Sequence, residues 1–271
     1  LRGCLKRTRI VSIKVFNLAP ILITDNITKS FGGLIAVNKV SIQIDERSIT
    51  GLIGPNGSGK TTLFNVSSGA LKADSGKAYF NGKRIDNLPC HLVYKAGLVR
   101  TFQVPRLFQK MTVLDNMLIA ARGLIGDSLL GTFFQPKAWK KQEEELVKKA
   151  LEILEMLDLY HQRKNIAGNL SGGQMKLLEL GRALMSDPKM LLLDEPAAGV
   201  SPLIVDKIFE KVVELRRNLG LTFFIIEHRI ETLFNYTDKV IVMFKGRVIA
   251  EGKGRELVEN PQVIDVYLGE Y

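Results

Sequence analysis

Hydrophobic and polar positions alternate in the first third of the chain. The run from Val40 to Ile44 alternates apolar and polar side chains, which predicts a strand with one buried face. From residue 21 to residue 53 we expect short strands and turns, with a turn at Phe31, Gly32 and Gly33. Residues 78–80 predict a further strand, and the turn residues that follow it at 81 and 82 complete an antiparallel edge.

The spacing becomes helical after about residue 101. Apolar residues recur every three or four positions in 113–121 and 143–159, which predicts two helices separated by a loop-like insertion at 122–140. A second α/β stretch begins near Lys189, with unbroken apolar runs at 190–193 and 221–226. Such runs are typical of strands buried on both faces of a mostly parallel sheet. The pattern predicts an α/β fold with a mostly parallel sheet, an antiparallel β subdomain and a helical subdomain.

Composition places the chain among globular proteins. Of its 271 residues, 46% are hydrophobic and 24% are charged, which excludes a disordered or fibrous chain. No run of 18 or more uninterrupted apolar residues occurs, so we do not expect the chain to span a membrane. Cys4 and Cys90 lie far apart, and this favours a reducing compartment over a disulfide framework.

The net charge of +10 is concentrated at the amino terminus. Residues 1–20 carry five basic side chains and no acid, so they supply +5, and the rest of the chain carries the other +5. A nucleic-acid-binding domain more often gathers its charge on a folded face, so we expect no nucleic-acid partner. The segment superficially resembles a secretory signal, but Lys14, Asn17 and Pro20 interrupt its apolar part. We expect a basic, flexible extension, or translated sequence upstream of the true start.

A glycine-rich segment between a strand-like run and a helical run fits the phosphate-binding pattern G-x-x-x-x-G-K-[ST]. It consists of Gly54, Pro55, Asn56, Gly57, Ser58, Gly59, Lys60, Thr61 and Thr62. The glycines let successive backbone N–H groups point at one anion, and the following helix adds the positive end of its dipole. Lys60 is placed to reach the β- and γ-phosphates, and the Thr61 hydroxyl is placed to hold Mg²⁺.

Two adjacent acids follow the apolar run that ends at Leu193. A carboxylate at the carboxyl end of a buried strand lies where open α/β sheets bind ligands, so Asp194 is expected to steady Mg²⁺ through its water shell. Glu195 is expected to accept a proton from an attacking water. Taken alone, this acid pair is more often a solvated strand end, and the preceding phosphate loop favours the functional interpretation.

A second helix start able to bind an anion lies at residues 170–174. Ser171 is expected to cap a helix over 175–186, while Gly172 and Gly173 expose backbone N–H groups and Gln174 follows them. By itself this pattern also fits an ordinary capped helix. With the phosphate loop and the Asp194-Glu195 pair, in this order and close to these spacings, the sequence resembles the nucleotide-binding subunits of ATP-binding cassette (ABC) transporters from about residue 21 to the end.

The resemblance implies further roles. Phe31 matches the aromatic residue that stacks on adenine, and Gln103 matches the glutamine that touches Mg²⁺ and the attacking water. His228 matches the switch histidine that contacts the γ-phosphate. The fold it implies is a P-loop ABC-ATPase core, one domain over 21–271 with the helical subdomain inserted at about 101–186. The implied cofactors are ATP and Mg²⁺. Residues 170–174 match the family's signature motif, and these signature residues of one subunit would close on the nucleotide of a second ABC ATPase subunit.

Several motifs that are less specific than the nucleotide-binding ones resemble those of the ATPases of branched-chain amino-acid importers. They include residues 99–103, 106–113, 196–202 and the ending 266–270. The resemblance implies hydrolysis at the cytoplasmic face of the cell membrane, coupled to transmembrane permease subunits and indirectly to an amino-acid-binding receptor. One segment departs from the family, because Ala198-Gly199-Val200-Ser201 stands where many members have Ser-Ala-Leu-Asp. This chain therefore lacks the aspartate that links the two nucleotide sites across the dimer in many family members, and the usual account of that link does not carry over to it.

Three alternatives remain open on the sequence. A cassette serving lipid or polysaccharide export is the strongest, since cargo leaves no mark on these residues. A non-transport cassette that acts on ribosomes or in DNA repair usually has two cassettes or inserted modules. An ATP-gated scaffold without turnover is disfavoured by the presence of Glu195 and His228.

Overall fold

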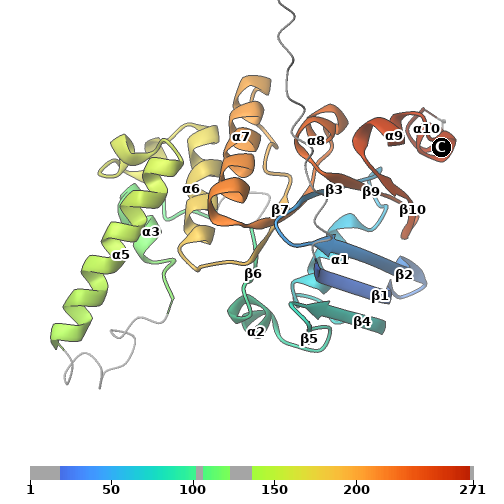
Figure 1. Ribbon diagram of the computed structural model, residues 1–271, viewed down its shortest axis with the longest axis horizontal. Coiled ribbons are helices and arrows are strands. Elements are labelled where there is room, and N and C mark those ends of the chain that lie inside the picture. Colours follow the sequence, from blue (N-terminus) through green and yellow to red (C-terminus); the bar gives the residue numbers. More distant parts are fainter. Residues whose placement is uncertain (1–18, 102–105, 123–135, 269–271) are drawn as a thin grey trace, which may run out of the picture.

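A six-stranded sheet lies at the centre of the computed structural model, which describes residues 19–101, 106–122 and 136–268 (Figure 1). Its order is β10-β9-β3-β8-β7-β6, and all neighbours are parallel except β10 and β9. The strands are β3 (Ile49–Ile53), β6 (Leu98–Arg100), β7 (Met190–Asp194), β8 (Thr222–Ile226), β9 (Lys239–Phe244) and β10 (Arg247–Gly252). Every residue of β7 and β8 is buried, as the apolar runs at 190–193 and 221–226 predict, and every residue of β3 is buried as well.

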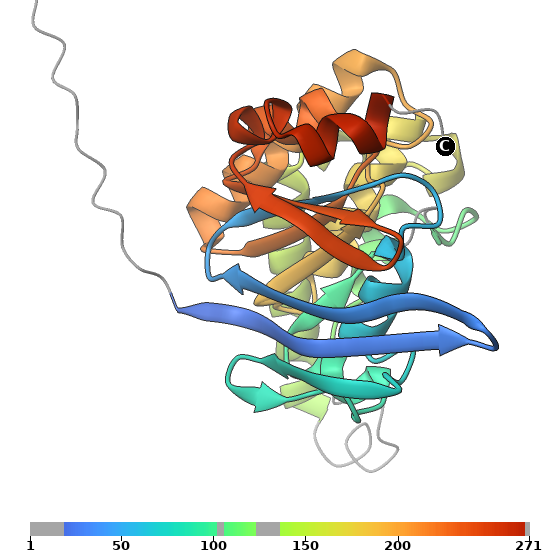
Figure 2. The same ribbon diagram turned by 90° about the vertical axis from the view of Figure 1, so that its right-hand side faces the viewer.

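A second sheet is antiparallel, with the order β2-β1-β4-β5. Its strands are β1 (Pro20–Phe31), β2 (Leu34–Asp45), β4 (Ser75–Phe80) and β5 (Lys83–Arg84), and Figure 2 shows the long β1–β2 hairpin crossing the molecule. The prediction of short strands at 21–53 was wrong for this pair. Bulges shift the register near Thr24 and Ile27, so the strands continue where the broken alternation indicated turns.

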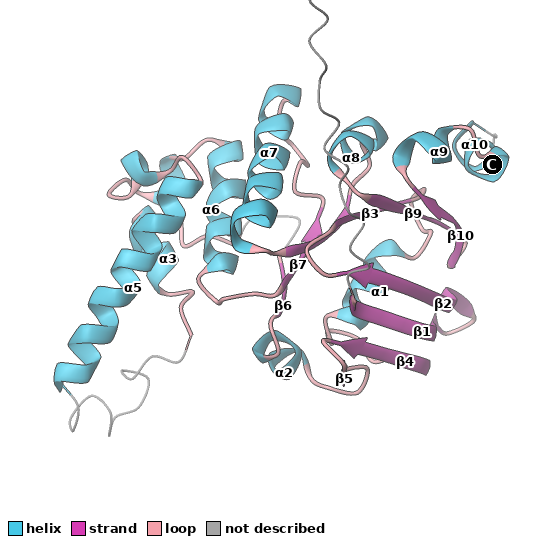
Figure 3. Ribbon diagram, in the orientation of Figure 1, coloured by secondary structure: helices cyan, strands magenta, loops and turns pink. Residues whose placement is uncertain are grey.

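The helices form two groups (Figure 3). Three of them pack against one another beyond the β6 edge of the central sheet: α3 (Val113–Leu118), α5 (Pro136–Met156) and α6 (Gly172–Leu184). The others are α1 (Lys60–Ser67), α2 (Cys90–Lys95), α7 (Pro202–Leu219), α8 (Ile230–Tyr236), α9 (Gly254–Val258) and α10 (Pro261–Leu268), with short 3₁₀ turns at Tyr160–Gln162 and Ala167–Asn169. Helix α7 contacts α6 and so joins this group to the sheet.

The central strands divide their side chains between two buried clusters. Leu191 and Phe223 belong to the cluster shared with the helices, whereas Leu192 and Phe224 belong to the cluster around α1 and the antiparallel sheet. In the second cluster the ring of Phe64 on α1 lies 4.8 Å from the ring of Phe224, measured between centroids. Full burial of each such side chain contributes about 2–3 kcal/mol, so the sheet is fixed from both faces.

Several helix boundaries differ from the prediction. Helix α5 begins at Pro136, within the expected 122–140 insertion, because proline suits the first helical turn and the exposed positions that follow carry good helix formers without an apolar stripe. Helix α6 begins at Gly172 rather than residue 175, and α3 ends at Leu118 rather than residue 121. Residues 1–18 of the predicted extension lie outside the described residues. The predicted fold class is confirmed.

Candidate functional site

The phosphate-binding loop joins the end of β3 to the start of α1. Gly54, Gly57 and Gly59 have φ values of 150°, 78° and 99°, in the region that L side chains rarely adopt. A Cβ on Gly54 would lie 2.2 Å from the Met243 carbonyl oxygen, so this position admits only glycine. No side chain caps α1 at Gly59, so the first N–H groups of the helix are left for an anion.

Lys60 is folded back on this loop. Its Nζ donates hydrogen bonds to the carbonyl oxygens of Gly54 at 2.8 Å and Pro55 at 3.0 Å. Burial lowers the pKa of Lys60, and attraction to Glu195 and Asp194 opposes that shift. The ammonium group is therefore held on the loop, within the electrostatic influence of the two acids that the sequence singles out.

A pocket of about 460 Å³ opens over the loop. Nine of the residues that the sequence predicts for the nucleotide site line this pocket. They come from the β1–β2 hairpin, from the loop and from the ends of β7 and β8: Phe31, Asn56, Gly57, Gly59, Lys60, Thr61, Thr62, Glu195 and His228. Of the loop residues, Ser58 is buried, and its hydroxyl has no hydrogen-bond partner among the described residues.

The mouth of the pocket is apolar. Phe31 is 48% exposed at the tip of the hairpin, and Leu34 and Ile35 beside it are 68% and 49% exposed. Large apolar side chains in solvent at the rim of a phosphate-binding pocket suit a flat, apolar group such as a nucleotide base. The sequence analysis missed Leu34 and Ile35, because it assigned them only to the expected strands and turns of residues 21–53.

Glu195 and His228 meet at the edge of the same pocket. Nε2 of His228 lies 2.9 Å from Oε1 of Glu195. Strands β7 and β8 are parallel neighbours, with Asp194 opposite Ile226, so the residues just beyond both strand ends come together. Glu195 has φ 50°, a left-handed conformation that costs a non-glycine residue about 1–3 kcal/mol and that marks functional sites.

Asp194 is held by a cation from the neighbouring strand. Its Oδ2 accepts from Nη2 of Arg100 at 2.7 Å, and Arg100 also donates to the side chain of Asn65 on α1. The sequence analysis used Arg100 only within residues 99–103, as a mark of lineage, and did not predict its contact with Asp194.

The oxygen donors present fit a magnesium ion. Thr61, which carries a hydroxyl, lines the pocket, and Asp194 supplies a carboxylate at the end of β7, directly before the pocket residue Glu195. The described part of the chain contains no group of three or more His, Cys, Asp or Glu side chains arranged to hold a metal. An ion here would depend on phosphate oxygens and water for its other ligands, as Mg²⁺ commonly does. Gln103, the third predicted ligand, lies outside the described residues.

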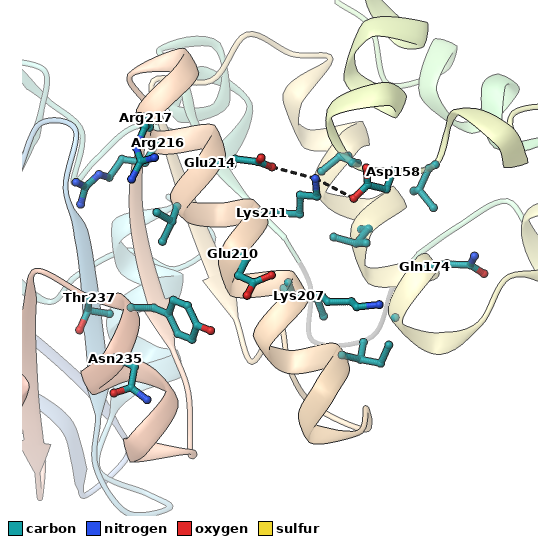
Figure 4. A pocket seen from close by; sticks show the side chains of 18 of the residues that line it. Asp158, Gln174, Lys207, Glu210, Lys211, Glu214, Arg216, Arg217, Asn235 and Thr237 are labelled. Atoms are coloured by element: carbon teal, nitrogen blue, oxygen red, sulfur yellow. Dashed lines mark hydrogen bonds and ion pairs between the residues drawn. The ribbon is translucent and has the colours of Figure 1, made fainter.

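The second helix start has the predicted cap. Ser171 Oγ accepts from the Gln174 N–H at 3.4 Å, and Gln174 Oε1 accepts from the Ser171 N–H at 2.9 Å. Ser171, Gly173 and Gln174 do not line the phosphate-loop pocket but a larger one of about 900 Å³ between α6 and α7 (Figure 4). There Lys211 bridges Asp158 and Glu214 at 2.9 Å each, so these charges are satisfied within the chain.

Known proteins resemble this chain over most of its length. The family model described as "ABC transporter" matches residues 37–198, and the one described as "Branched-chain amino acid ATP-binding cassette transporter" matches residues 247–271. The probable branched-chain amino acid transport ATP-binding protein LivG of Archaeoglobus fulgidus is 50% identical over 249 residues, which cover 92% of this chain and 95% of that protein. The chain belongs to the branched-chain amino acid family of ABC transporter ATP-binding proteins.

Solved structures agree with this family. The ADP conformation of an ATP-binding cassette of an ABC transporter is 48% identical, with a TM-score of 0.80 over 93% of this chain and 99% of that chain. A dimeric post-hydrolysis ATP-binding cassette bound to ADP and Pi is 27% identical, with a TM-score of 0.70 over 86% of this chain and 99% of that chain. The predicted resemblance is confirmed, and this ABC ATPase binds ATP and couples its hydrolysis to transport. Within the described ranges, no helix has the length and apolar character needed to cross a bilayer.

The carboxyl-terminal segment of this ABC ATPase reaches the nucleotide loop. Tyr267 on α10 packs against the helix-side core cluster. Burial raises the pKa of Tyr267 to about 12, and a hydrogen bond with the backbone of Gly54 opposes that shift. The segment used in the sequence analysis only as a mark of lineage therefore contacts the first glycine of the loop.

The signature helix of the ABC ATPase is packed too tightly for a side chain at one glycine. A Cβ on Gly173 would lie 2.3 Å from Cγ2 of Ile204 on α7. We expect Gly173→Ala to lower the free energy of unfolding by about 1–3 kcal/mol, because α6 and α7 must separate. Urea denaturation measures this change.

Two variants control that measurement. At Gly172 the nearest atom to an added Cβ is 3.7 Å away, so Gly172→Ala should be nearly neutral. The double variant Gly173→Ala/Ile204→Ala should lose less free energy of unfolding than the two single variants lose in sum, because the shorter side chain at 204 makes room for the new methyl group. A Gly173→Ala chain as stable as wild type, or strictly additive with Ile204→Ala, would show that this contact does not limit the packing.

Proposed function

We propose that this chain hydrolyses ATP·Mg²⁺ at a composite site formed with a second ABC ATPase subunit, and that it thereby energises uptake of branched-chain amino acids. The second subunit is another copy or a sister ATPase. Together they act at the cytoplasmic face of the cell membrane on transmembrane permease subunits, which an amino-acid-binding receptor supplies with cargo. The chain from residue 21 onward is one domain, in which about 101–186 contains the helical subdomain.

One observation carries the proposal. The phosphate loop, the apolar rim and the Glu195–His228 pair surround one pocket, whereas Ser171, Gly173 and Gln174 at the start of α6 line a different one. A single chain therefore has two helix N-termini suited to binding phosphate, those of α1 and α6, and they do not meet at one pocket. The dimeric structure of the relative bound to ADP and Pi supports a site shared between two subunits.

Within this site we assign the steps as follows. Phe31 stacks on the base, while the loop amides and Lys60 bind the phosphates. Thr61, Asp194 and Gln103 hold Mg²⁺, which when bound neutralises charge on the phosphate oxygens. Glu195 accepts the proton of the attacking water, and His228 contacts the γ-phosphate. Ser171, Gly172, Gly173 and Gln174 of the other subunit complete the clamp.

Transport by the reconstituted complex tests the cargo. We expect labelled leucine, isoleucine or valine to accumulate in proteoliposomes only when ATP is present on the ATPase side and the receptor is present on the other side. The loaded receptor should raise phosphate release by about tenfold, since binding energy across the membrane favours closure of the dimer. Stimulation by a lipid or polysaccharide, with no response to these amino acids, would contradict the import of branched-chain amino acids.

A further inference from the structure

A buried carboxylate joins the ends of β7 and β8. Glu227 is 4% exposed. Its Oε1 accepts from the backbone N–H of Ala197 at 2.7 Å, and its Oε2 accepts from the backbone N–H of His228 at 3.2 Å. One oxygen thus serves the loop after β7, and the other serves the loop after β8.

These two loops carry the pair at the edge of the nucleotide pocket. Ala197 lies two residues after Glu195, whose own N–H donates to the carbonyl oxygen of Ile226 at 3.0 Å. The carbonyl oxygen of Glu195 accepts from the N–H of Ala198 at 3.0 Å, which closes the turn. The Glu227 carboxylate therefore bonds the backbone of His228 itself and the backbone of the turn that begins at Glu195.

A third element also faces this carboxylate. Lys176 on α6 interacts electrostatically with Glu179, Glu227, Glu195 and Asp194, and these attractions oppose the lowering of its pKa by burial. Burial raises the pKa of Glu227, and its hydrogen bonds from Ala197 and His228 oppose that shift. Lys176 lies on α6, two residues after Gln174, so this helix adds a positive charge to the surroundings of both strand ends.

We propose that Glu227 is a positioning residue for hydrolysis, which holds Glu195 and His228 in mutual reach by accepting one hydrogen bond from each loop. The proposal rests on the proposed function, in which Glu195 activates the attacking water. The alternative is that Glu227 only satisfies buried N–H groups, in which case its loss changes stability and leaves turnover unaffected.

Glu227→Gln separates the two roles. The carboxamide has the same shape but only one acceptor oxygen, so it can serve one loop and presents an N–H group to the other. Because small displacements of reacting groups cost up to about 100-fold in rate, we expect kcat for ATP hydrolysis to fall by about 10- to 100-fold. The phosphate loop is unchanged, so KM for ATP should stay within about twofold.

Glu227→Asp provides the second variant. It keeps the charge and both oxygens on a side chain one methylene shorter, so kcat should fall by less than in Glu227→Gln, about 3- to 10-fold. If Glu227→Gln does not fold, a kcat loss in Glu227→Asp at constant KM still supports the proposal. The proposal would be overturned if both variants had lowered thermal midpoints but kept the wild-type kcat. If Glu227→Gln does not fold, a wild-type kcat in Glu227→Asp would overturn it.

A matched control is available on α6. Glu179 is 8% exposed and faces the same Lys176, but it lies on the helix rather than at a strand end. Glu179→Gln should leave kcat within about threefold of wild type. An equal kcat loss in Glu179→Gln would show that charge facing Lys176, not loop positioning, is responsible, and the proposal would fail. Glu195→Gln is assayed in parallel, because undiminished hydrolysis there would refute the proposed function itself.

Discussion

Replacing Glu195 by glutamine is expected to lower steady-state ATP hydrolysis by about 10²- to 10³-fold, because an amide cannot take a proton from water. The amide has the shape of the carboxylate, so the contact with Nε2 of His228 at 2.9 Å can persist and the pocket is preserved. Phosphate release by the purified chain measures the loss. Affinity for ATP, measured with a fluorescent analogue, should change little, since the loop and Lys60 remain.

An exposed glutamate on α5 supplies the matched control. Glu144 lines neither the nucleotide pocket nor the pocket between α6 and α7, and Glu144→Gln should hydrolyse ATP at the wild-type rate. Hydrolysis near the wild-type rate in Glu195→Gln would exclude Glu195 as the activator.

The same variant tests the composite site. With turnover blocked, ATP stays bound, and the two halves of the clamp should remain closed as a dimer at high protein concentration. Light scattering after gel filtration, with and without ATP, measures this association. A Glu195→Gln chain that binds ATP but remains a monomer, with and without its sister ATPase, would contradict a site shared between subunits.

Local chemistry made part of this site predictable from the sequence. The phosphate loop needs contiguous residues, since positive φ at Gly54, Gly57 and Gly59 and the start of α1 follow from neighbours in the chain. The cap at Ser171 is likewise a contact over three residues, and the structure has it as predicted. The buried strands were predictable because burial on both faces leaves an unbroken apolar run.

Contacts between distant residues were not predictable in this way. Glu227 and Ala197 are 30 positions apart, and Arg100 and Asp194 are 94 apart, so no pattern along the chain links them. Their positions depend on which strands become neighbours in the sheet. The early start of α5 was missed for a different reason, because its first turns are exposed and leave no hydrophobic period to detect.

Replacing Lys60 by alanine is expected to abolish nucleotide binding at physiological concentrations. Lys60 is the buried cation of the loop, and loss of a buried, charged hydrogen-bond donor to phosphate costs about 2–5 kcal/mol, or roughly 30- to 5000-fold in affinity. Isothermal titration calorimetry with ATP in the presence of Mg²⁺ measures the loss. Hydrolysis should fall below detection, because the same cation faces the phosphates during the reaction.

Two comparisons distinguish a lost ligand contact from a damaged loop. The Lys60 ammonium group also bonds the carbonyl oxygens of Gly54 and Pro55, so circular dichroism and a thermal midpoint must show that Lys60→Ala remains folded. Lys72→Ala removes an exposed lysine outside the pocket and controls for net charge, and its affinity for ATP should equal that of wild type. If a folded Lys60→Ala chain kept tight ATP binding, the loop after β3 would not be the phosphate cradle. The Glu195–His228 pair at its edge would then have no phosphate to act on, and the catalytic assignment would be lost with the binding assignment.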